Sequence, residues 1–391
     1  MEPMRARRPH LALAATLLLP LTALPAQAAA LFDRVAEVVD DRLFDRAFCE
    51  RDLPALVDRF RPAALAATSA AEERAVVHAL LAQVPASHLA LLSAATHRRL
   101  EAELMGRRTA MVGCSILRLG ARCFVDGVYD GGPAQRAGLR AGDEVLAIDG
   151  LPPGASPRLD WRSDDAHLSD PPTHDLLVDD GDAVRFTLGP AGSKRDVEVV
   201  AAQWSGLQAS TQSVRAIETG GRRLLYVHLW FVFHARAARL LQDALKDHDD
   251  CEGLLLDLRG RGGSALECAA IVRAVADAAE RGVPTVALVD ARTRSAKEVV
   301  ASDLKRRGIA LLVGERTAGA VLPASFVQVA DDSVLMLPEN RLGQQSARIE
   351  GHGVEPDYAV SAPLPPVPDH DPILHAGIDA LVKILGAPTG R

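Results

Sequence analysis

The sequence predicts a layered α/β protein, with a helical segment at its N-terminus and a β-rich module inserted before the α/β part. Three stretches lead to this fold class. Residues 206–391 alternate short apolar strands with amphipathic helices, the pattern of a sheet covered by helices. Residues 29–107 show apolar side chains at helical spacing. Residues 108–205 contain short runs of Val, Ile and Leu between Gly and Asp turns, which indicates a small β-rich unit.

The composition excludes several classes of protein. The chain has 391 residues, of which 48% are apolar and 24% charged, and these ordinary values exclude a disordered chain, a collagen-like chain and a coiled-coil rod. The length predicts two or three domains. The chain has 44 basic and 51 acidic residues, a net charge of −7, so we expect no nucleic-acid partner. Nothing in the sequence specifies an oligomeric state.

The first 28 residues have the features of a secretory signal peptide. A head with three arginines precedes an apolar run from Leu11 to Leu24, and Ala26-Gln27-Ala28 then supplies the small residues of a cleavage site. The run is too short to span a bilayer comfortably, and no later stretch reaches about 18 apolar residues. We therefore expect cleavage after residues 1–28, a mature chain that begins at Ala29 without a membrane span, and a periplasmic or secreted protein.

The five cysteines leave two alternatives open. An exported chain meets an oxidising compartment, so one or two disulfides are expected as readily as buried, unpaired thiols. Cys114 and Cys123 lie nine residues apart on two apolar runs and could face each other across a hairpin. No CxxC or HExxH pattern occurs, so the sequence implies neither a metal nor an organic cofactor.

Three turn motifs characterise the β-rich module. Gly131-Gly132-Pro133-Ala134 begins a short helix, Ala137-Gly138-Leu139 ends it, and a strand runs from Gly142-Asp143 to Ile148-Asp149-Gly150. Together these motifs resemble a PDZ domain of the circularly permuted bacterial kind. The resemblance implies that an extended chain end binds to the module by strand addition, with backbone amides holding its carboxylate.

The loop before the first strand of such a module holds the end of the bound chain. Val112, Gly113 and Cys114 are the candidates for this loop, on position alone. Residues 154–182 depart from the PDZ pattern as an acidic insertion with a Pro-Pro pair. We expect a solvated loop there rather than a calcium site.

Strand and turn patterns organise the α/β part. Leu254-Leu255-Leu256-Asp257-Leu258 indicates a strand buried on both faces. Residues 326–337 predict a hairpin around Asp331-Asp332-Ser333. The Pro-rich tail over 362–372 is expected to be irregular.

Ser295 is the candidate nucleophile. It ends a polar turn after a buried strand and begins a helix, where the helix dipole favours developing negative charge. An isolated Ser-x-x-Glu would more often be a helix cap, so the surrounding segments decide the interpretation. Asp257-Leu258-Arg259-Gly260-Arg261-Gly262-Gly263 precedes Ser295, and Gly353-Val354-Glu355-Pro356-Asp357 follows it.

These segments, in this order and after a PDZ-like module, resemble the C-terminal processing (tail-specific) serine peptidase family over roughly residues 31–360. The resemblance implies that Ser295 attacks the peptide bond. Many members use a Lys base in a Thr-x-Gly-Lys segment, but this chain has Thr317-Ala318-Gly319-Ala320 there. Lys297 lies two residues along the helix from Ser295 and is expected to point elsewhere.

A second branch, which resembles the tricorn core protease, uses Ser, His and Glu instead of Lys. Ser87 and His88 directly precede the PDZ-like module, and Glu350 lies just before the final Gly-Val-x-Pro-Asp segment. We expect His88 to act as the base and Glu350, helped by Ser87, to orient it, because imidazole suits proton transfer near neutral pH. His352, beside Glu350, is the rival base.

The glycine-rich turn is expected to complete the site. Backbone N–H groups of Gly262 or Gly263, together with that of Ala296, are the candidates for an oxyanion hole. The turn also satisfies a loose dinucleotide-binding pattern. However, the next acidic residue at a strand end, Asp290, comes 30 residues after Gly260 rather than about 20, which disfavours a nucleotide site.

These features predict an exported serine endopeptidase that cleaves proteins or peptides engaged near their C-termini. The alternative is a PDZ-bearing scaffold or peptide-binding protein on an inactive peptidase fold. The alanine at Ala320 and the arginine at Arg261 favour that alternative, whereas the retention of all four catalytic candidates argues against it.

Overall fold

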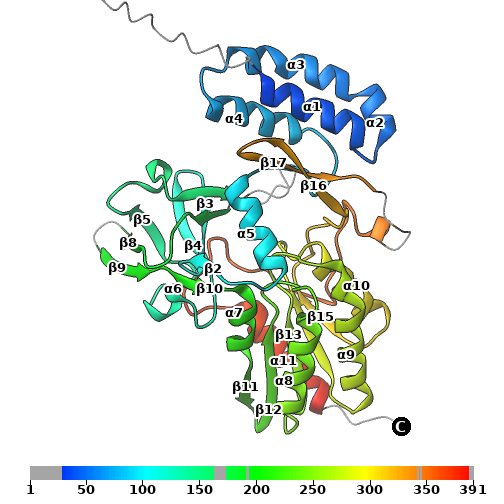
Figure 1. Ribbon diagram of the computed structural model, residues 1–391. Coiled ribbons are helices and arrows are strands. Elements are labelled where there is room, and N and C mark those ends of the chain that lie inside the picture. Colours follow the sequence, from blue (N-terminus) through cyan, green and yellow to red (C-terminus); the bar gives the residue numbers. More distant parts are fainter. Residues whose placement is uncertain (1–28, 163–172, 191–192, 341–342, 344–345, 387–391) are drawn as a thin grey trace, which may run out of the picture.

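The structure is a computed structural model that describes residues 29–162, 173–190, 193–340, 343 and 346–386. The expected signal peptide lies outside these residues. Within the described part of the chain, no helix is both long and apolar enough to cross a membrane. The layered α/β fold class is confirmed, and Figure 1 shows helices at one end of the molecule, a β-rich unit at its side and the α/β layers below.

Four helices form the N-terminal end of the molecule, and a hairpin from the second half of the chain completes their core. The helices are α1 (Ala30–Arg42), α2 (Arg46–Arg51), α3 (Leu53–Ala66) and α4 (Ala70–Leu81). Buried side chains of these helices pack against Leu335 and Leu337 of the hairpin formed by β16 (Ala324–Ala330) and β17 (Ser333–Pro338). The hairpin expected over 326–337 is thereby confirmed.

A short strand follows the helices and ties them to this hairpin. β1 (Ala90–Ser93) pairs antiparallel with β17, with Ala90 opposite Met336. Strand β1 begins two residues after His88, and α5 (Ala94–Leu104) follows directly, capped by Ser93. The N-terminal segment is therefore joined through β17 to the part of the chain that surrounds Glu350.

The β-rich unit is a seven-stranded antiparallel sheet. Its order is β6-β7-β3-β4-β5-β8-β9, so the strands next to each other in space are only partly consecutive in sequence. The strands are β3 (Cys114–Leu119), β4 (Arg122–Val128), β5 (Glu144–Ile148), β6 (Leu159–Arg162), β7 (Thr173–Leu176), β8 (Ala183–Leu188) and β9 (Arg195–Val200). Between β4 and β5 lies the one-turn helix α6 (Pro133–Arg136), which Pro133 begins as expected. A two-stranded ribbon of β2 (Thr109–Met111) and β10 (Ala202–Trp204) closes the unit.

The insertion at 154–182 is more ordered than expected. Its described residues form a 3₁₀ turn (Pro153–Ala155) and the β6–β7 hairpin, which extends the sheet, so the expectation of a solvated loop is wrong for this part. Asp182 binds Arg158 at 2.9 Å. Among the described residues of the insertion, no group of acidic ligands gathers into a cation site.

A six-stranded sheet with helices on both faces forms the α/β part. Its order is β11-β12-β13-β14-β15-β18, parallel except for the β11–β12 pair. The strands are β11 (Arg215–Thr219), β12 (Arg222–His228), β13 (Gly253–Asp257), β14 (Thr285–Val289), β15 (Leu311–Gly314) and β18 (Tyr358–Ala359). Every residue of β13 is buried, as its run of leucines predicted.

Two sets of helices cover this sheet. Helices α8 (Ala237–Asp247), α9 (Cys268–Glu280) and α10 (Ala296–Arg306) bury one face, and α11 (Pro372–Gly386) buries the other, while α7 (Gly206–Ser213) precedes β11. Helix α11 was not predicted from the sequence, because the Pro-rich segment before it obscured the helical spacing of Ile373, Gly377 and Leu381. Gly377 lets α11 approach the sheet closely, since a Cβ there would lie 2.4 Å from a Leu288 methyl group.

All five cysteines are unpaired, so the disulfide alternative is not realised. Cys114 lies opposite Val128 and Cys123 lies opposite Arg118, which places the two thiols at different positions of the β3–β4 hairpin. Burial raises the pKa of Cys114 and of Cys268 to about 12, so both remain neutral thiols.

Candidate functional site

Ser295 lies where β14 gives way to α10, and its backbone is held in an unusual conformation. Its φ is 56° and its ψ −128°, a region that L-residues rarely adopt. The Ser295 N–H donates to the carbonyl of Ala320 at 2.7 Å and to Oε2 of Glu298 at 3.3 Å. These contacts hold the half-buried serine at the tip of a tight turn in front of the helix.

The side chain of Glu298 connects this turn to the segment after β15. Its buried carboxylate accepts hydrogen bonds from Thr317 Oγ1 (2.5 Å), Gly319 N (2.7 Å) and Ala320 N (2.8 Å). Burial raises the pKa of Glu298, and these hydrogen bonds oppose the rise. The Ser-x-x-Glu pattern thus does more than cap a helix, because it positions Ser295 against a second part of the chain.

The glycine-rich turn lies directly against Ser295. A Cβ at Gly262 would be 2.5 Å from the Cβ of Ser295, and a Cβ at Gly263, whose φ is 142°, would be 2.5 Å from the backbone nitrogen of Val232. Only glycine allows either approach. Among the described residues, no acceptor binds the backbone N–H of Gly262, Gly263 or Ala296. Within the described part of the chain, none of the three predicted oxyanion donors is therefore engaged in a hydrogen bond.

Ser87, His88 and Glu350 form one hydrogen-bonded unit. Ser87 Oγ donates to Glu350 Oε2 at 3.0 Å and lies 3.1 Å from His88 Nδ1, while Ser87 N donates to Glu350 Oε1 at 3.2 Å. Ser87 is fully buried and His88 is half-buried. His88 has a φ of 56°, so its backbone, like that of Ser295, is in the left-handed region.

One short segment links this unit to Ser295. The carbonyl of Ala320 accepts the Ser295 N–H, Val321 N donates to Glu350 Oε2 at 2.8 Å, and Leu322 N donates to Ser87 Oγ at 3.3 Å. Ala320, Val321 and Leu322 are consecutive, and consecutive Cα atoms lie about 3.8 Å apart. One three-residue segment therefore makes the hydrogen bonds both to Ser295 and to the unit of Ser87, His88 and Glu350. Ser295 and His88 are 207 residues apart in sequence, and the structure brings their surroundings together.

His352, the rival base, and Lys297 both have backbone carbonyl groups as hydrogen-bond partners. His352 is exposed, and its Nδ1 lies 2.8 Å from the carbonyl oxygen of Glu350 rather than from the carboxylate. Lys297 is fully buried, and its Nζ donates to the carbonyls of Arg259 (2.7 Å) and Trp230 (3.3 Å). Burial lowers the pKa of Lys297 to about 8. The expectation that Lys297 points away from Ser295 is confirmed by these contacts.

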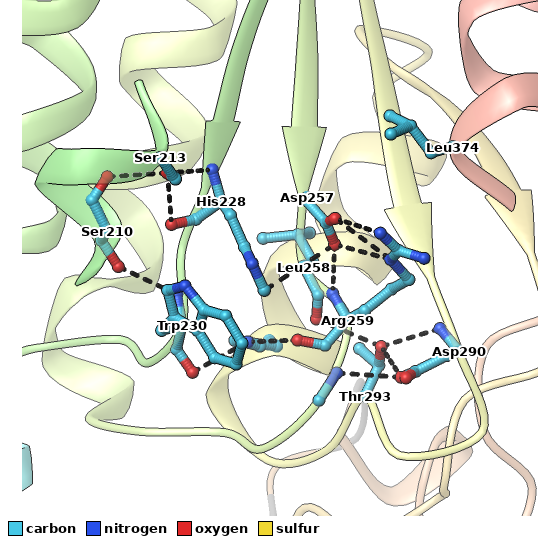
Figure 2. Close-up of polar contacts among 12 residues, drawn as sticks. Ser210, Ser213, His228, Trp230, Asp257, Leu258, Arg259, Asp290, Thr293 and Leu374 are labelled. Carbon is cyan, nitrogen blue, oxygen red and sulfur yellow. Dashed lines mark hydrogen bonds and ion pairs between the residues drawn. The ribbon is translucent and has the colours of Figure 1, made fainter. Parts of the chain in front are cut away.

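A buried ion pair supports the strand end before the glycine-rich turn (Figure 2). Asp257 accepts hydrogen bonds from Arg259 Nε at 3.0 Å and from Arg259 Nη2 at 2.6 Å. It also accepts one from Tyr226 Oη at 2.8 Å. Burial alone would raise the pKa of Asp257, but the guanidinium of Arg259 outweighs it and holds this pKa well below its usual range. Arg259 also binds Asp371 at 2.8 Å, which connects the turn to the start of α11.

Asp290 is hydrogen-bonded to the same glycine-rich turn. Its Oδ1 accepts from Gly260 N at 3.0 Å and from Thr293 Oγ1 at 2.9 Å, as Figure 2 shows for the Thr293 contact. The carboxylate thereby links the end of β14 to the glycine-rich turn. Asp290 is the residue that a dinucleotide site would use to bind a ribose, and here its carboxylate is hydrogen-bonded within the chain.

A cavity of about 860 Å³ lies between the seven-stranded sheet and the α/β part. The predicted chain-end loop of Val112, Gly113 and Cys114 lines it, together with Gly260 and Arg261 of the glycine-rich turn. The carbonyls of Val112 and Gly113 accept hydrogen bonds from the N–H groups of Ala134 and Tyr129, which attach the loop to the start of α6 and to the residue after β4. The loop and the turn therefore open onto one shared space.

Comparisons with known proteins agree with the motifs. Residues 274–360 match the family model of peptidase family S41, and residues 124–157 match a PDZ domain model. A chloroplastic C-terminal processing peptidase of Tetradesmus obliquus is 25% identical over 294 residues, which cover 66% of this chain and 60% of the relative. A carboxyl-terminal-processing protease of Synechocystis sp. is 27% identical over 270 residues, 60% of this chain and 58% of the relative. The chain thus spans less than two thirds of the length of these relatives.

Both branches of the predicted resemblance find a counterpart. A tricorn protease homolog of Streptomyces coelicolor is 24% identical over 394 residues, 90% of this chain and 32% of the homolog. The solved photosystem II D1 C-terminal processing protease is 21% identical with a TM-score of 0.51, covering 86% of this chain and 94% of the other. The tricorn protease is 16% identical with a TM-score of 0.51, covering 92% and 37%. The resemblance to C-terminal processing and tricorn-type serine peptidases is confirmed in sequence, and the fold is shared.

Proposed function

We propose that this chain is a serine endopeptidase that cleaves proteins or peptides engaged near their C-termini. The observation that carries the proposal is the shared segment at Ala320–Leu322, which attaches Ser295 at one end and the Ser87–His88–Glu350 unit at the other. A nucleophile, a base and an orienting carboxylate at one place are the parts that acyl transfer needs. The peptidase names of the relatives support the same reaction class.

The hydrogen-bond pattern supports His88 as the base. Ser87 Oγ has one proton, which it donates to Glu350, so its lone pairs face the Nδ1–H of His88 and the N–H of Leu322. This assignment leaves the lone pair on Nε2 of His88. The charge of Glu350 then stabilises, through Ser87, the imidazolium that forms when His88 accepts a proton.

The reaction proceeds in two steps that share these groups. Ser295 Oγ attacks the carbonyl carbon while its proton moves to Nε2 of His88, and the imidazolium then gives that proton to the leaving amine as the C–N bond breaks. A water molecule repeats the sequence on the acyl-enzyme and releases the second fragment. The N–H groups of Ala296 and of Gly262 or Gly263 stabilise the oxyanion in both steps, because they have no acceptor among the described residues.

The substrate and the location of the enzyme follow from features outside the catalytic groups. The PDZ-like module and the cavity at Val112–Cys114 support protein or peptide chain ends as substrates. The features of residues 1–28 support export to the periplasm or the medium. Mass spectrometry of the exported protein is expected to find Ala29 at its N-terminus, and intact Met1 on cytoplasmic protein would contradict export.

A covalent label tests the activity directly. Purified protein is treated with a fluorophosphonate, and the modified residue is identified by mass spectrometry. We expect labelling at Ser295, loss of labelling in Ser295→Ala, and unchanged labelling in Ser69→Ala, where Ser69 is the matched serine at the N-terminus of α4. An unlabelled wild-type protein would favour the scaffold alternative.

A further inference from the structure

The edge of β3, where a bound chain end is expected to add as a strand, is already paired with another strand of this chain. Strand β3 follows the predicted chain-end loop, so a bound peptide would pair with β3 on the side away from β4. That side carries β7, which runs antiparallel to β3 with Ile116 opposite His174 and Leu117 opposite Thr173. The chain's own β7 therefore occupies the position of the ligand.

The β6–β7 hairpin is fastened to two further parts of the molecule. Asp160 of β6 accepts hydrogen bonds from Ser93 Oγ, at 3.1 Å, and from Thr96 Oγ1 at the start of α5. Thr173 of β7 accepts a hydrogen bond from the guanidinium of Arg261. Since Arg261 immediately precedes Gly262 in the turn beside Ser295, β7 contacts both the peptide edge and the turn that supplies the oxyanion donors.

The contact between β7 and β3 is short. Among the described residues, two pairs join β7 to β3, and the pairing does not continue to Cys114 and Ser115, which line the cavity. Buried apolar side chains of Val112, Leu139 and Leu176 line this opening. The last residues of an apolar chain end can enter there, but a longer extended peptide meets β7.

We propose that β7 is an internal occupant of the strand-addition site, and that an extended chain end must displace it from β3 to bind. The proposal rests on the proposed function, since it concerns how substrate chain ends reach that site. Displacement breaks the contact between Thr173 and Arg261, which couples substrate arrival to the glycine-rich turn. Apparent affinity for a chain end is then reduced by the fraction of molecules in which β7 has left β3.

Binding of an extended fluorescein-labelled peptide, long enough to meet β7 and with apolar last residues and a free carboxylate, tests this in the Ser295→Ala protein. Thr173→Val removes the acceptor for Arg261, a hydrogen bond from a charged group, and is expected to tighten binding about tenfold. Thr187→Val is the matched control, because it removes an exposed hydrogen bond to Asp196 between β8 and β9 and is expected to leave binding unchanged. Equal affinities in all three proteins would contradict the role of β7.

A reversible cross-link provides the second arm. Leu117→Cys with Thr173→Cys places two thiols directly opposite each other on β3 and β7. The oxidised form is expected to lose peptide binding and the reduced form to regain it. Full binding by the oxidised form, or no binding by any variant, would overturn the proposal. The fluorophosphonate label on protein with Ser295 intact separates this result from a failure of the proposed catalytic function.

Discussion

Replacing Glu298 by Gln tests whether this carboxylate holds the nucleophile in place. The substitution keeps the size of the side chain but changes one oxygen to an NH₂ group. Four donors converge on the carboxylate, namely the hydroxyl of Thr317 and the N–H groups of Gly319, Ala320 and Ser295. Gln has a single oxygen, so it cannot accept from all of them.

The expected loss can be worked out from this pattern. Thr317 Oγ1 can turn to accept from the new NH₂ group, but a backbone N–H cannot, so at least one buried N–H is left without an acceptor. Such a group costs about 1–3 kcal/mol, and the remaining hydrogen bonds lose the strength that the negative charge gave them. We therefore expect Glu298→Gln to lower the free energy of unfolding by about 2–4 kcal/mol.

Denaturant unfolding and the rate of fluorophosphonate labelling measure the two consequences. Glu72→Gln is the matched control, because Glu72 holds the same position behind the N-cap of α4 but is exposed. We expect this control to change stability by about 0.5 kcal/mol at most and to leave the labelling rate unchanged. If Glu298→Gln matched the wild-type protein in both stability and labelling rate, the argument that Glu298 positions Ser295 would be wrong.

Three further predictions concern the base, the glycine-rich turn and the buried lysine. His88→Ala should lose peptidase activity as completely as Ser295→Ala, and the double variant should be little worse, because the members of a catalytic unit are not additive. His352→Ala should stay active. If kinetics showed an active His88→Ala and an inactive His352→Ala, the base would be His352. Gly262→Ala should lower kcat by about 10²–10³, because its Cβ would lie 2.5 Å from that of Ser295 and push the donors away; an active, folded variant would contradict this. The pKa of Lys297 falls from 10.5 to about 8, so the folded state disfavours its charged form. Between these two pH values the unfolded chain binds the proton more tightly, and stability should rise with pH by up to about 3 kcal/mol relative to Lys297→Met; parallel stability curves for the two proteins would refute it.

Local turn chemistry made much of the site predictable from the sequence. The polar turn before α10, the glycines of the turn at Gly262 and Gly263, and the Pro133 helix start each depend on neighbouring residues, so short motifs identify them. The hairpin of β16 and β17 was predictable for the same reason. The role of Glu298 was not, because the same Ser-x-x-Glu pattern serves as a simple helix cap in α4.

The sequence by itself determined the α/β fold class and the PDZ-like module, and it predicted Ser295 as nucleophile and His88 as base. Only the tertiary structure decided that Ala320–Leu322 joins Ser295 to the unit of Ser87, His88 and Glu350. It also decided that β7 covers β3 and that no cysteines pair. Strands far apart in the chain pair according to which sheet edges and faces are still exposed after the other elements have packed. A local pattern of residues cannot predict that pairing.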